Sequence, residues 1–232
     1  MQITRDGLYK VVCMIYTPST QVVGTGCFVE KEKIPYLATA EHVSTSTLAD
    51  SVLVFGESDS TNHIVTLSSI IKGNWIVHPR ADLSVIQLDV QKLDFRFNER
   101  FFPFSQVQHS MDVISRDREL TTVGFPVGLG TSLKGSSKFS PLTFRSYASS
   151  SYMSLPRADK KIVSDFFCLE NPAMGGYSGG PIFDLGYLCT PVMRQSYGET
   201  TLLGFVHGTY SDQTGGKIAL VTPSYYLKDI IP

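Results

Sequence analysis

Residues 175–181 read Gly-Gly-Tyr-Ser-Gly-Gly-Pro, and this segment decides how the rest of the chain is interpreted. Ser178 stands between glycines, directly before the apolar residues Ile182 and Phe183. Glycines allow backbone conformations that other residues avoid and let a bound molecule approach the main chain closely. Nucleophilic serine chemistry needs an exposed hydroxyl beside backbone N–H groups that stabilise an oxyanion. The N–H groups of Gly176 and Ser178 are the candidates, although an ordinary glycine turn would have the same pattern.

A reactive serine requires a general base, usually histidine, and that histidine requires an orienting carboxylate. His42 ends the apolar run of residues 36–43, YLATAEHV, where small neighbours leave room for it to pack against another barrel. Asp82 stands at the start of the alternating run in residues 78–90, HPRADLSVIQLDV. Taken alone, each is more often a structural residue, a core histidine or a turn aspartate. Their joint occurrence with Ser178 weakens those interpretations.

His42, Asp82 and Ser178 follow one another in this order, with a shorter gap before Asp82 than after it. The order and the gaps resemble those of the chymotrypsin-like, or trypsin-like, serine peptidases. Further segments resemble the same family. Residues 24–29, GTGCFV, are similar to the glycine-rich strand before its catalytic histidine. Residues 123–130, VGFPVGLG, and 171–183, NPAMGGYSGGPIF, resemble the peptidase domain of its HtrA-type branch, and residues 203–210, LGFVHGTY, resemble the strand that lines its specificity pocket. The resemblance covers nearly the whole chain, and we expect no attached peptide-binding domain within it.

The resemblance implies an all-β fold of two six-stranded antiparallel β-barrels with a short C-terminal helix. Residues 1–110 would form the N-terminal barrel, which carries His42 and Asp82. Residues 111–232 would form the C-terminal barrel, which carries Ser178 and the specificity pocket.

The pattern along the chain agrees with this expectation. Short β-rich runs separated by turn residues recur in two series, which is typical of barrels and sandwiches. The polar stretch 106–118 separates the two series and is the candidate linker. Residues 224–231 follow Pro223, and a proline near a helix start is favourable. Residues 95–104, FRFNERFFPF, are expected to pack between the barrels.

By the same resemblance, we expect the chain to be a serine endopeptidase that hydrolyses peptide bonds through an acyl-enzyme. Ser178 would be the nucleophile, His42 the base and Asp82 the residue that orients it, with an oxyanion hole formed by the N–H groups of Gly176 and Ser178. An alternative from another class is a catalytically silent peptide-binding module on the same fold. Tyr177 favours it weakly, because secreted relatives have an aspartate at this position and a bulky residue could distort the loop.

The resemblance also places Pro172, Val206, His207, Gly208 and Thr209 at the bound substrate. His207 has three interpretations: it hydrogen-bonds Asp82, it recognises a Glu or Gln side chain in the pocket as in glutamyl endopeptidases and viral 3C-type proteases, or it is an ordinary strand residue. No carboxylate is available for the pocket floor, which disfavours Lys or Arg before the scissile bond. We expect small or aliphatic residues there, or Glu and Gln if His207 faces the pocket.

The chain has 20 Lys and Arg against 21 Asp and Glu, so its net charge of −1 singles out neither a nucleic acid nor a membrane as a partner. The expected partner is a protein or peptide substrate, and a regulatory partner is compatible with the sequence. There is no apolar run of bilayer-spanning length and no secretory signal pattern. The four cysteines, Cys13, Cys27, Cys168 and Cys189, have no zinc-site spacing. We expect buried thiols, a cytoplasmic protein, no metal and no cofactor.

Overall fold

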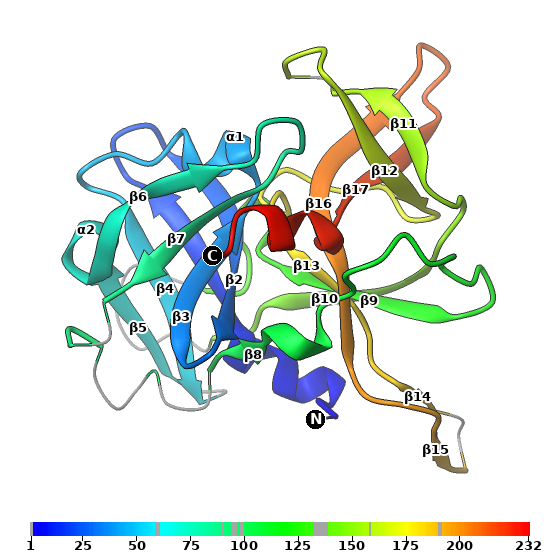
Figure 1. Ribbon diagram of the computed structural model, residues 1–232, viewed down its shortest axis with the longest axis horizontal. Coiled ribbons are helices and arrows are strands. Elements are labelled where there is room, and N and C mark those ends of the chain that lie inside the picture. The colour runs from blue at the N-terminus through cyan, green and yellow to red at the C-terminus, as the bar shows by residue number, and fades with distance from the viewer. Residues whose placement is uncertain are drawn as a thin grey trace.

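The computed structural model describes residues 2–58, 61–89, 91–93, 97, 100–131, 139–157, 159–189 and 192–232. Its strands gather in two large, mainly antiparallel sheets that follow one another along the chain (Figure 1). The all-β fold of antiparallel sheets expected from the sequence is confirmed. The division of the chain into two domains at residue 110 stays a prediction.

The first sheet runs in the order β5-β4-β1-β2-β3-β7-β6, with β8 paired to β2. Its strands are β1 (Val12–Thr17), β2 (Val22–Lys31), β3 (Ile34–Thr39), β4 (Val52–Ser58), β5 (Thr61–Thr66), β6 (Ile71–Val77), β7 (Ser84–Leu88) and β8 (Phe102–Pro103). Glu32 and Lys33 join β2 to β3 with positive φ angles, as a two-residue hairpin turn requires. The side chains of β2 and β3 are mostly buried, which places these strands at the centre of the sheet.

The second sheet runs in the order β10-β9-β13-β16-β17-β12-β11. Its strands are β9 (Glu119–Gly124), β10 (Leu142–Tyr147), β11 (Met153–Pro156), β12 (Val163–Leu169), β13 (Pro181–Asp184), β16 (Thr201–Ser211) and β17 (Lys217–Pro223). A separate hairpin of β14 (Tyr187–Cys189) and β15 (Arg194–Ser196) extends away from it (Figure 1).

Within the described residues the two sheets have eight and seven strands, where six per barrel were expected. Two of the three additional strands have local causes. The two-residue strand β8 pairs parallel to β2 through Val29 and Phe102, and β11 adds an edge strand against β12. Both additions extend the sheets without changing the antiparallel order of the others.

The helices of the described residues are short. They are η1 (Arg5–Val11), α1 (Glu41–Ser44), α2 (Leu67–Ile70), η3 (Phe104–Gln106), η4 (Pro126–Gly128) and η5 (Ser224–Asp229). The helix expected after Pro223 is present as the 3-10 helix η5, and its Tyr225, Tyr226 and Leu227 pack in the same apolar core as the first sheet. None of the described helices is long and apolar enough to cross a membrane.

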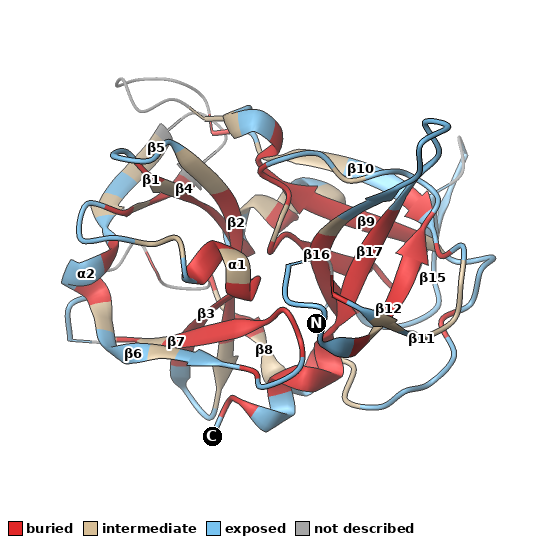
Figure 2. Cartoon of the chain, turned by 90° about the horizontal axis from the view of Figure 1, so that it is seen from above, coloured by how far each residue is buried: buried red, intermediate tan, exposed pale blue. Residues whose placement is uncertain are grey.

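One apolar cluster contains residues of both sheets, and another belongs mainly to the second sheet. Figure 2 colours the buried residues of both sheets red. Phe102 of the first sheet and Phe183 of the second lie with ring centroids 5.2 Å apart, so part of the phenylalanine-rich segment packs between the sheets as expected. Phe97 is an exception, because it packs inside the first sheet's core against Phe28 and Phe55. Phe95 lies outside the described residues.

Three of the four cysteines, Cys13, Cys27 and Cys168, are buried free thiols. The expectation of a fourth buried thiol was wrong, because Cys189 is exposed. It lies on β14, in the hairpin that extends away from both sheets and so has little core to enter.

Candidate active site

His42 and Asp82 come together at one end of the first sheet. His42 lies in the single turn α1, which follows β3, and Asp82 lies in the loop before β7. The side chain of His78 shapes that loop, because its Nδ1 accepts the N–H groups of Arg80 and Ala81 at 3.1 and 2.8 Å. Asp82 is fully buried, whereas the side chain of His42 is 35% exposed. The loop thus presents a desolvated carboxylate to a histidine that a bound molecule can reach.

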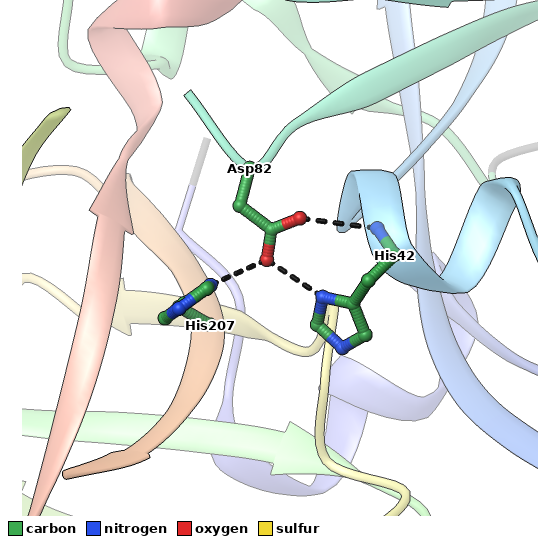
Figure 3. A group of neighbouring side chains, drawn as sticks. All are labelled: His42, Asp82 and His207. Carbon is green, nitrogen blue, oxygen red and sulfur yellow. Dashed lines mark hydrogen bonds and ion pairs between the residues drawn. The ribbon is translucent and has the colours of Figure 1, made fainter. Parts of the chain in front are cut away.

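The two residues are joined twice (Figure 3). His42 Nδ1 lies 2.8 Å from Asp82 Oδ2, and the backbone N–H of His42 donates to Asp82 Oδ1 at 3.1 Å. This fixes the ring so that its Nε2 faces away from the carboxylate. Nε2 is therefore the nitrogen that is available to exchange a proton with a third group.

His207 is the second histidine at the same carboxylate. Its Nδ1 lies 2.6 Å from Asp82 Oδ2, which is the first of its three sequence interpretations. The residue reaches Asp82 because the β16–β17 register shifts between Val206 and Gly208, and such a bulge redirects a side chain. Its imidazole, buried with Asp82, packs against Phe166 at a centroid distance of 5.1 Å.

Hydrogen bonds decide the charge of this group. Burial alone raises the pKa of Asp82, but the hydrogen bonds from His207 and His42 outweigh it and hold that pKa well below its ordinary value. For His42, burial lowers the pKa, while the hydrogen bond and charge of Asp82 raise it, and the net pKa lies above 6.5. Asp82 is therefore ionised near neutral pH and favours the protonated form of His42.

Ser178 lies on the loop between β12 and β13. Its hydroxyl donates weakly to the backbone carbonyl of His207, with 3.4 Å between the oxygens. Within the described residues no hydrogen bond joins Ser178 to His42. The hydroxyl of the sequence-predicted nucleophile is thus turned to the His207 carbonyl and not to the predicted base.

The backbone of the loop before Ser178 is held by its carbonyl groups. All four carbonyl oxygens of residues 175–178 accept hydrogen bonds: Gly175 O from Val127 N at 2.6 Å, Gly176 O from Thr25 Oγ1 at 2.8 Å, Tyr177 O from Gly180 N at 2.7 Å, and Ser178 O from Thr25 N at 2.9 Å. In the described part of the chain, the N–H groups of Gly176 and Ser178 have no partner. Two free N–H groups beside a serine hydroxyl are what an oxyanion site requires.

Glycine is needed at two points of this loop. Gly176 has a φ of 90°, and a Cβ there would meet Phe125 O at 2.3 Å. Gly179 has a φ of 78°, and a Cβ there would lie 2.1 Å from Thr39 Oγ1. Both positions combine a left-handed backbone with a close approach, so the glycines of the motif have a steric cause.

A mostly apolar cavity of about 330 Å³ lies behind the loop. Its lining residues are Thr122, Phe144, Ser146, Leu169, Asn171, Pro172, Ala173, Met174, Tyr177, Val206 and Ala219. Two of the predicted substrate contacts, Pro172 and Val206, are among them, whereas His207 and Gly208 are not. Thr209 lies at one side, where its hydroxyl donates to Ala173 O at 2.6 Å. None of the lining residues carries a charge.

Among the described residues, two groups of side chains have potential metal ligands within 4.8 Å of one another: His42, Asp82 and His207, and Glu41, Asp82 and Asp159. Asp82 belongs to both, and the Arg157 guanidinium lies 3.3 Å from its Oδ1. A cation would have to displace this guanidinium or the histidine hydrogen bonds. Side chains therefore balance the charge here, and the absence of a metal stays a prediction.

Two residues at this site were missed in the sequence analysis. Arg157 belongs to a polar turn, and nothing in the spacing of its residues indicates that Arg157 contacts Asp82. Thr25 belongs to the glycine-rich strand, and its contacts with the Ser178 loop exist only once the two sheets have docked. A threonine between two glycines at residues 24–26 was the one local signal that could have indicated it.

Comparison with known proteins gives a family and a fold. The family model described as Trypsin matches residues 5–231. No curated protein matches the chain. The solved structure of the HtrA-type protease AlgW with tripeptide is similar at 18% identity and a TM-score of 0.63, covering 96% of this chain and 59% of that one. The apo MamO protease domain from Magnetospirillum magneticum is similar at 13% identity and a TM-score of 0.60, covering 97% of both. The present chain thus spans less than two thirds of the AlgW chain, and at these identities the likeness concerns the fold.

Proposed function

Because the chain belongs to the trypsin family, whose model matches residues 5–231, we propose that it is a serine endopeptidase that cleaves peptide bonds through an acyl-enzyme. The observation that carries the proposal is a pairing of two features. His42 is oriented by a buried, ionised Asp82, and Ser178 lies on a loop with two free N–H groups. A protein that only bound peptides would need neither feature.

In the proposed reaction the Ser178 hydroxyl turns from the His207 carbonyl to His42 Nε2 when substrate binds. Hydrogen bonds of this kind are often long or misaligned in a free enzyme and tighten in the complex. Ser178 Oγ then attacks the peptide carbonyl and His42 takes the hydroxyl proton. Asp82 stabilises the resulting imidazolium, and the N–H groups of Gly176 and Ser178 stabilise the oxyanion.

His42 next gives its proton to the leaving amine, and the C–N bond breaks. Water enters and loses a proton to His42 as it attacks the acyl group. Collapse of the second tetrahedral intermediate returns that proton to Ser178 and releases the carboxylate product. Every proton thus passes through one nitrogen, His42 Nε2.

The cavity beside Ser178 indicates the preferred substrate. Its walls are mainly apolar, and no carboxylate is available in it for a Lys or Arg side chain. The imidazole of His207 faces Asp82, which leaves the cavity without a histidine for Glu or Gln. We therefore propose that it takes an apolar side chain before the scissile bond, with walls of Leu169, Val206 and Ala219.

The edge of β16 can hold the substrate backbone. The pairing of β13 with β16 reaches Phe205, and beyond it β16 continues to pair with β17 on its other side. In the described residues this leaves one edge of Gly208 and Thr209 without a partner strand. A substrate in an extended conformation could add there as a strand, as in other cases of peptide recognition by a sheet edge.

Labelling with a fluorophosphonate tests the proposed function. The parent protein should be modified at Ser178, as mapped by mass spectrometry, and both Ser178→Ala and His42→Ala should abolish labelling. Ser154→Ala is the matched control, because this serine donates to Asp165 on an exposed strand and should not affect labelling. With a cleaved peptide, Ser178→Ala should lower kcat by roughly 10⁶-fold. Parent-level cleavage by that variant would contradict the assignment.

A second candidate function is the catalytically silent peptide-binding module. The orientation of the Ser178 hydroxyl toward the His207 carbonyl favours it, because the serine then does not contact its base. Such a module would bind an extended apolar peptide, as measured by calorimetry, without any labelling at Ser178. Labelling at Ser178 that depends on His42 would exclude it.

A further inference from the structure

Arg157 is the largest fully buried side chain among the described residues, with 1% of it exposed. It begins the turn between β11 and β12, where its N–H donates to Ile162 O at 2.8 Å and its carbonyl accepts the Lys161 N–H at 2.9 Å. A buried guanidinium is costly unless its charge is balanced and its N–H groups are hydrogen-bonded. Its partners therefore explain why it is there.

Those partners belong to the first half of the chain and to the turn itself. Arg157 Nη2 donates to Asp82 Oδ1 at 3.3 Å, and Nε donates to Asp159 Oδ1 at 2.9 Å. Nη1 lies 2.7 Å from Glu41 Oε2, a close ion pair without the geometry of a directed hydrogen bond. Lys160, from the same turn, pairs with the other carboxylate oxygen of Glu41. One turn of the second sheet thus contacts both residues that flank His42 in space.

Asp82 is consequently held from three sides. Oδ2 accepts from His42 and His207, while Oδ1 accepts from the His42 backbone and from Arg157. A carboxylate with both oxygens occupied cannot rotate without breaking several contacts. Arg157 supplies the only contact of these four that carries a permanent positive charge.

We propose that Arg157 is a positioning residue for the His42–Asp82 pair, anchoring the carboxylate from the opposite half of the molecule. The inference rests on the proposed function in taking His42 as the general base. Arg157 touches no reacting atom in that mechanism and acts through Asp82. The charge of Arg157 also opposes protonation of His42, so the contact of Arg157 with Asp82 links the packing of the two halves to the protonation of the base.

In the described part of the chain, six charged or titratable groups belong to the cluster around His42. Asp82 and Glu41 come from the first sheet's side, Arg157, Asp159 and Lys160 from the turn, and His207 from β16. The hydrogen bond and charge of Asp82 raise the pKa of His42, and Asp159 raises it further, whereas Arg157 lowers it. Two substitutions in one turn should therefore move the titration of His42 in opposite directions.

The test is the titration of the His42 imidazole, followed by NMR through its ring nitrogens and assigned by the signal lost in His42→Gln. In Arg157→Gln the midpoint should rise above that of the parent. In Asp159→Asn it should fall, and in Arg157→Lys, which keeps the charge, it should return toward the parent value. Arg145→Gln is the matched control, because it removes an arginine from an exposed ion pair with Glu119, and it should not move the midpoint.

A structural role alone predicts a different pattern. If Arg157 only fixed the turn, Arg157→Gln would lower thermal stability and leave the His42 midpoint unchanged, and this result in a folded variant would overturn the proposal. Should Arg157→Gln fail to fold, Asp159→Asn decides, because Asp159 is partly exposed and an unchanged or raised midpoint there contradicts the proposal.

Kinetics separate this inference from the proposed function. The titration needs no substrate, so a moved midpoint in a protein that fluorophosphonate does not label would support the positioning role and reject the peptidase. In a labelled protein, Arg157→Gln should lower kcat roughly 10-fold to 100-fold with little change in KM, the scale expected for a displaced catalytic group. It should also move the acid limb of kcat/KM to higher pH by the same amount as the NMR midpoint. If Arg157→Gln were labelled at the parent rate and the acid limb of its kcat/KM profile did not move, the peptidase assignment would stand and the positioning role of Arg157 would be rejected.

Discussion

The two halves of the candidate site are held by different interactions. On one side, His42 and Asp82 are fixed by side chains and by charge: two histidines and an arginine surround one buried carboxylate. On the other, the Ser178 loop is fixed by its backbone, because four consecutive carbonyls are hydrogen-bonded and two N–H groups are left free. We therefore expect substitutions around Asp82 to change the charge of the site and the pH dependence of activity. Substitutions around the Ser178 loop should instead change the geometry of its backbone.

Replacing Asp82 with asparagine should have the largest effect on the charged side. The asparagine amide cannot carry the negative charge that orients and stabilises the His42 imidazolium. Its NH2 group would also be a donor facing other donors, those of His42, His207 or Arg157. We expect kcat for a peptide substrate to fall roughly 10⁴-fold, with a smaller change in KM. Asp212→Asn, an exposed aspartate of the β16–β17 turn, is the control. An Asp82→Asn enzyme with near-parent kcat would show that the charge is not needed.

Thr25→Val tests the backbone-held side. It removes the hydroxyl that donates to Gly176 O at 2.8 Å and accepts from Phe125 N at 3.1 Å, with little change in shape. We expect kcat to fall roughly 10-fold to 100-fold, somewhat less than for direct loss of an oxyanion donor. Thr17→Val is the matched control, because Thr17 is equally buried and its hydroxyl bonds Ser51 at 2.7 Å and Ser46 O at 3.3 Å rather than the Ser178 loop. If both variants lose similar stability and only Thr25→Val has a lower kcat, the proposed role of Thr25 is supported. If the two variants have the same kcat, it is contradicted.

The pH dependence of the parent sharpens the comparison further. In the proposed mechanism His42 must be neutral to accept a proton, and its pKa is raised above 6.5 because Asp82 outweighs the effect of burial. The value of kcat/KM should therefore fall as pH decreases through a midpoint above 6.5, by about tenfold per pH unit below it. The acid limb of kcat/KM should keep the same midpoint in Thr25→Val, because this substitution changes backbone geometry and not the charges around His42. A limb centred below 6.5 would contradict the described charge balance.

Tyr177→Phe should give the smallest effect. The Tyr177 hydroxyl donates to Leu142 O at 2.8 Å, and its ring packs against Phe144. Losing this bond should lower the free energy of unfolding by about 1 kcal/mol, which is a shift of about 2–4 °C in Tm for a chain of this size. Because the carbonyls of the Ser178 loop keep their partners, kcat should stay within about twofold of the parent. A large loss of kcat without a loss of stability would mean that the hydroxyl acts in the site.

Local motifs explain how much could be predicted from the sequence. The glycine-rich Ser178 loop and the helix after Pro223 were expected, because each depends on a few adjacent residues whose types limit the backbone. The proximity of His42 to Asp82, which are far apart in the sequence, was expected only from the family resemblance. The interpretation of His207 stayed open, since a one-residue shift in a strand changes where a side chain points. The bulge after Val206 decides this, and its sequence signal is weak.

The features that could not be predicted depend on contacts between distant segments. Arg157 meets Glu41 and Asp82 only because the turn after β11 docks on the other half, and β11 itself was not expected as a strand. Thr25 likewise joins the Ser178 loop across the two halves. Cys189 was expected to be buried from its residue type, but the exposure of the β14–β15 hairpin determines the outcome.

Intact-protein mass spectrometry of an acyl-enzyme tests the central claim most directly. The protein is mixed with an activated ester of an N-acylated phenylalanine, quenched in acid after increasing times, and the adduct is mapped by proteolysis. The account predicts an acyl adduct on Ser178 that forms and then disappears, is absent in Ser178→Ala, and forms far more slowly in His42→Ala. An adduct on another residue, or no adduct at any time in a folded parent protein, would contradict it.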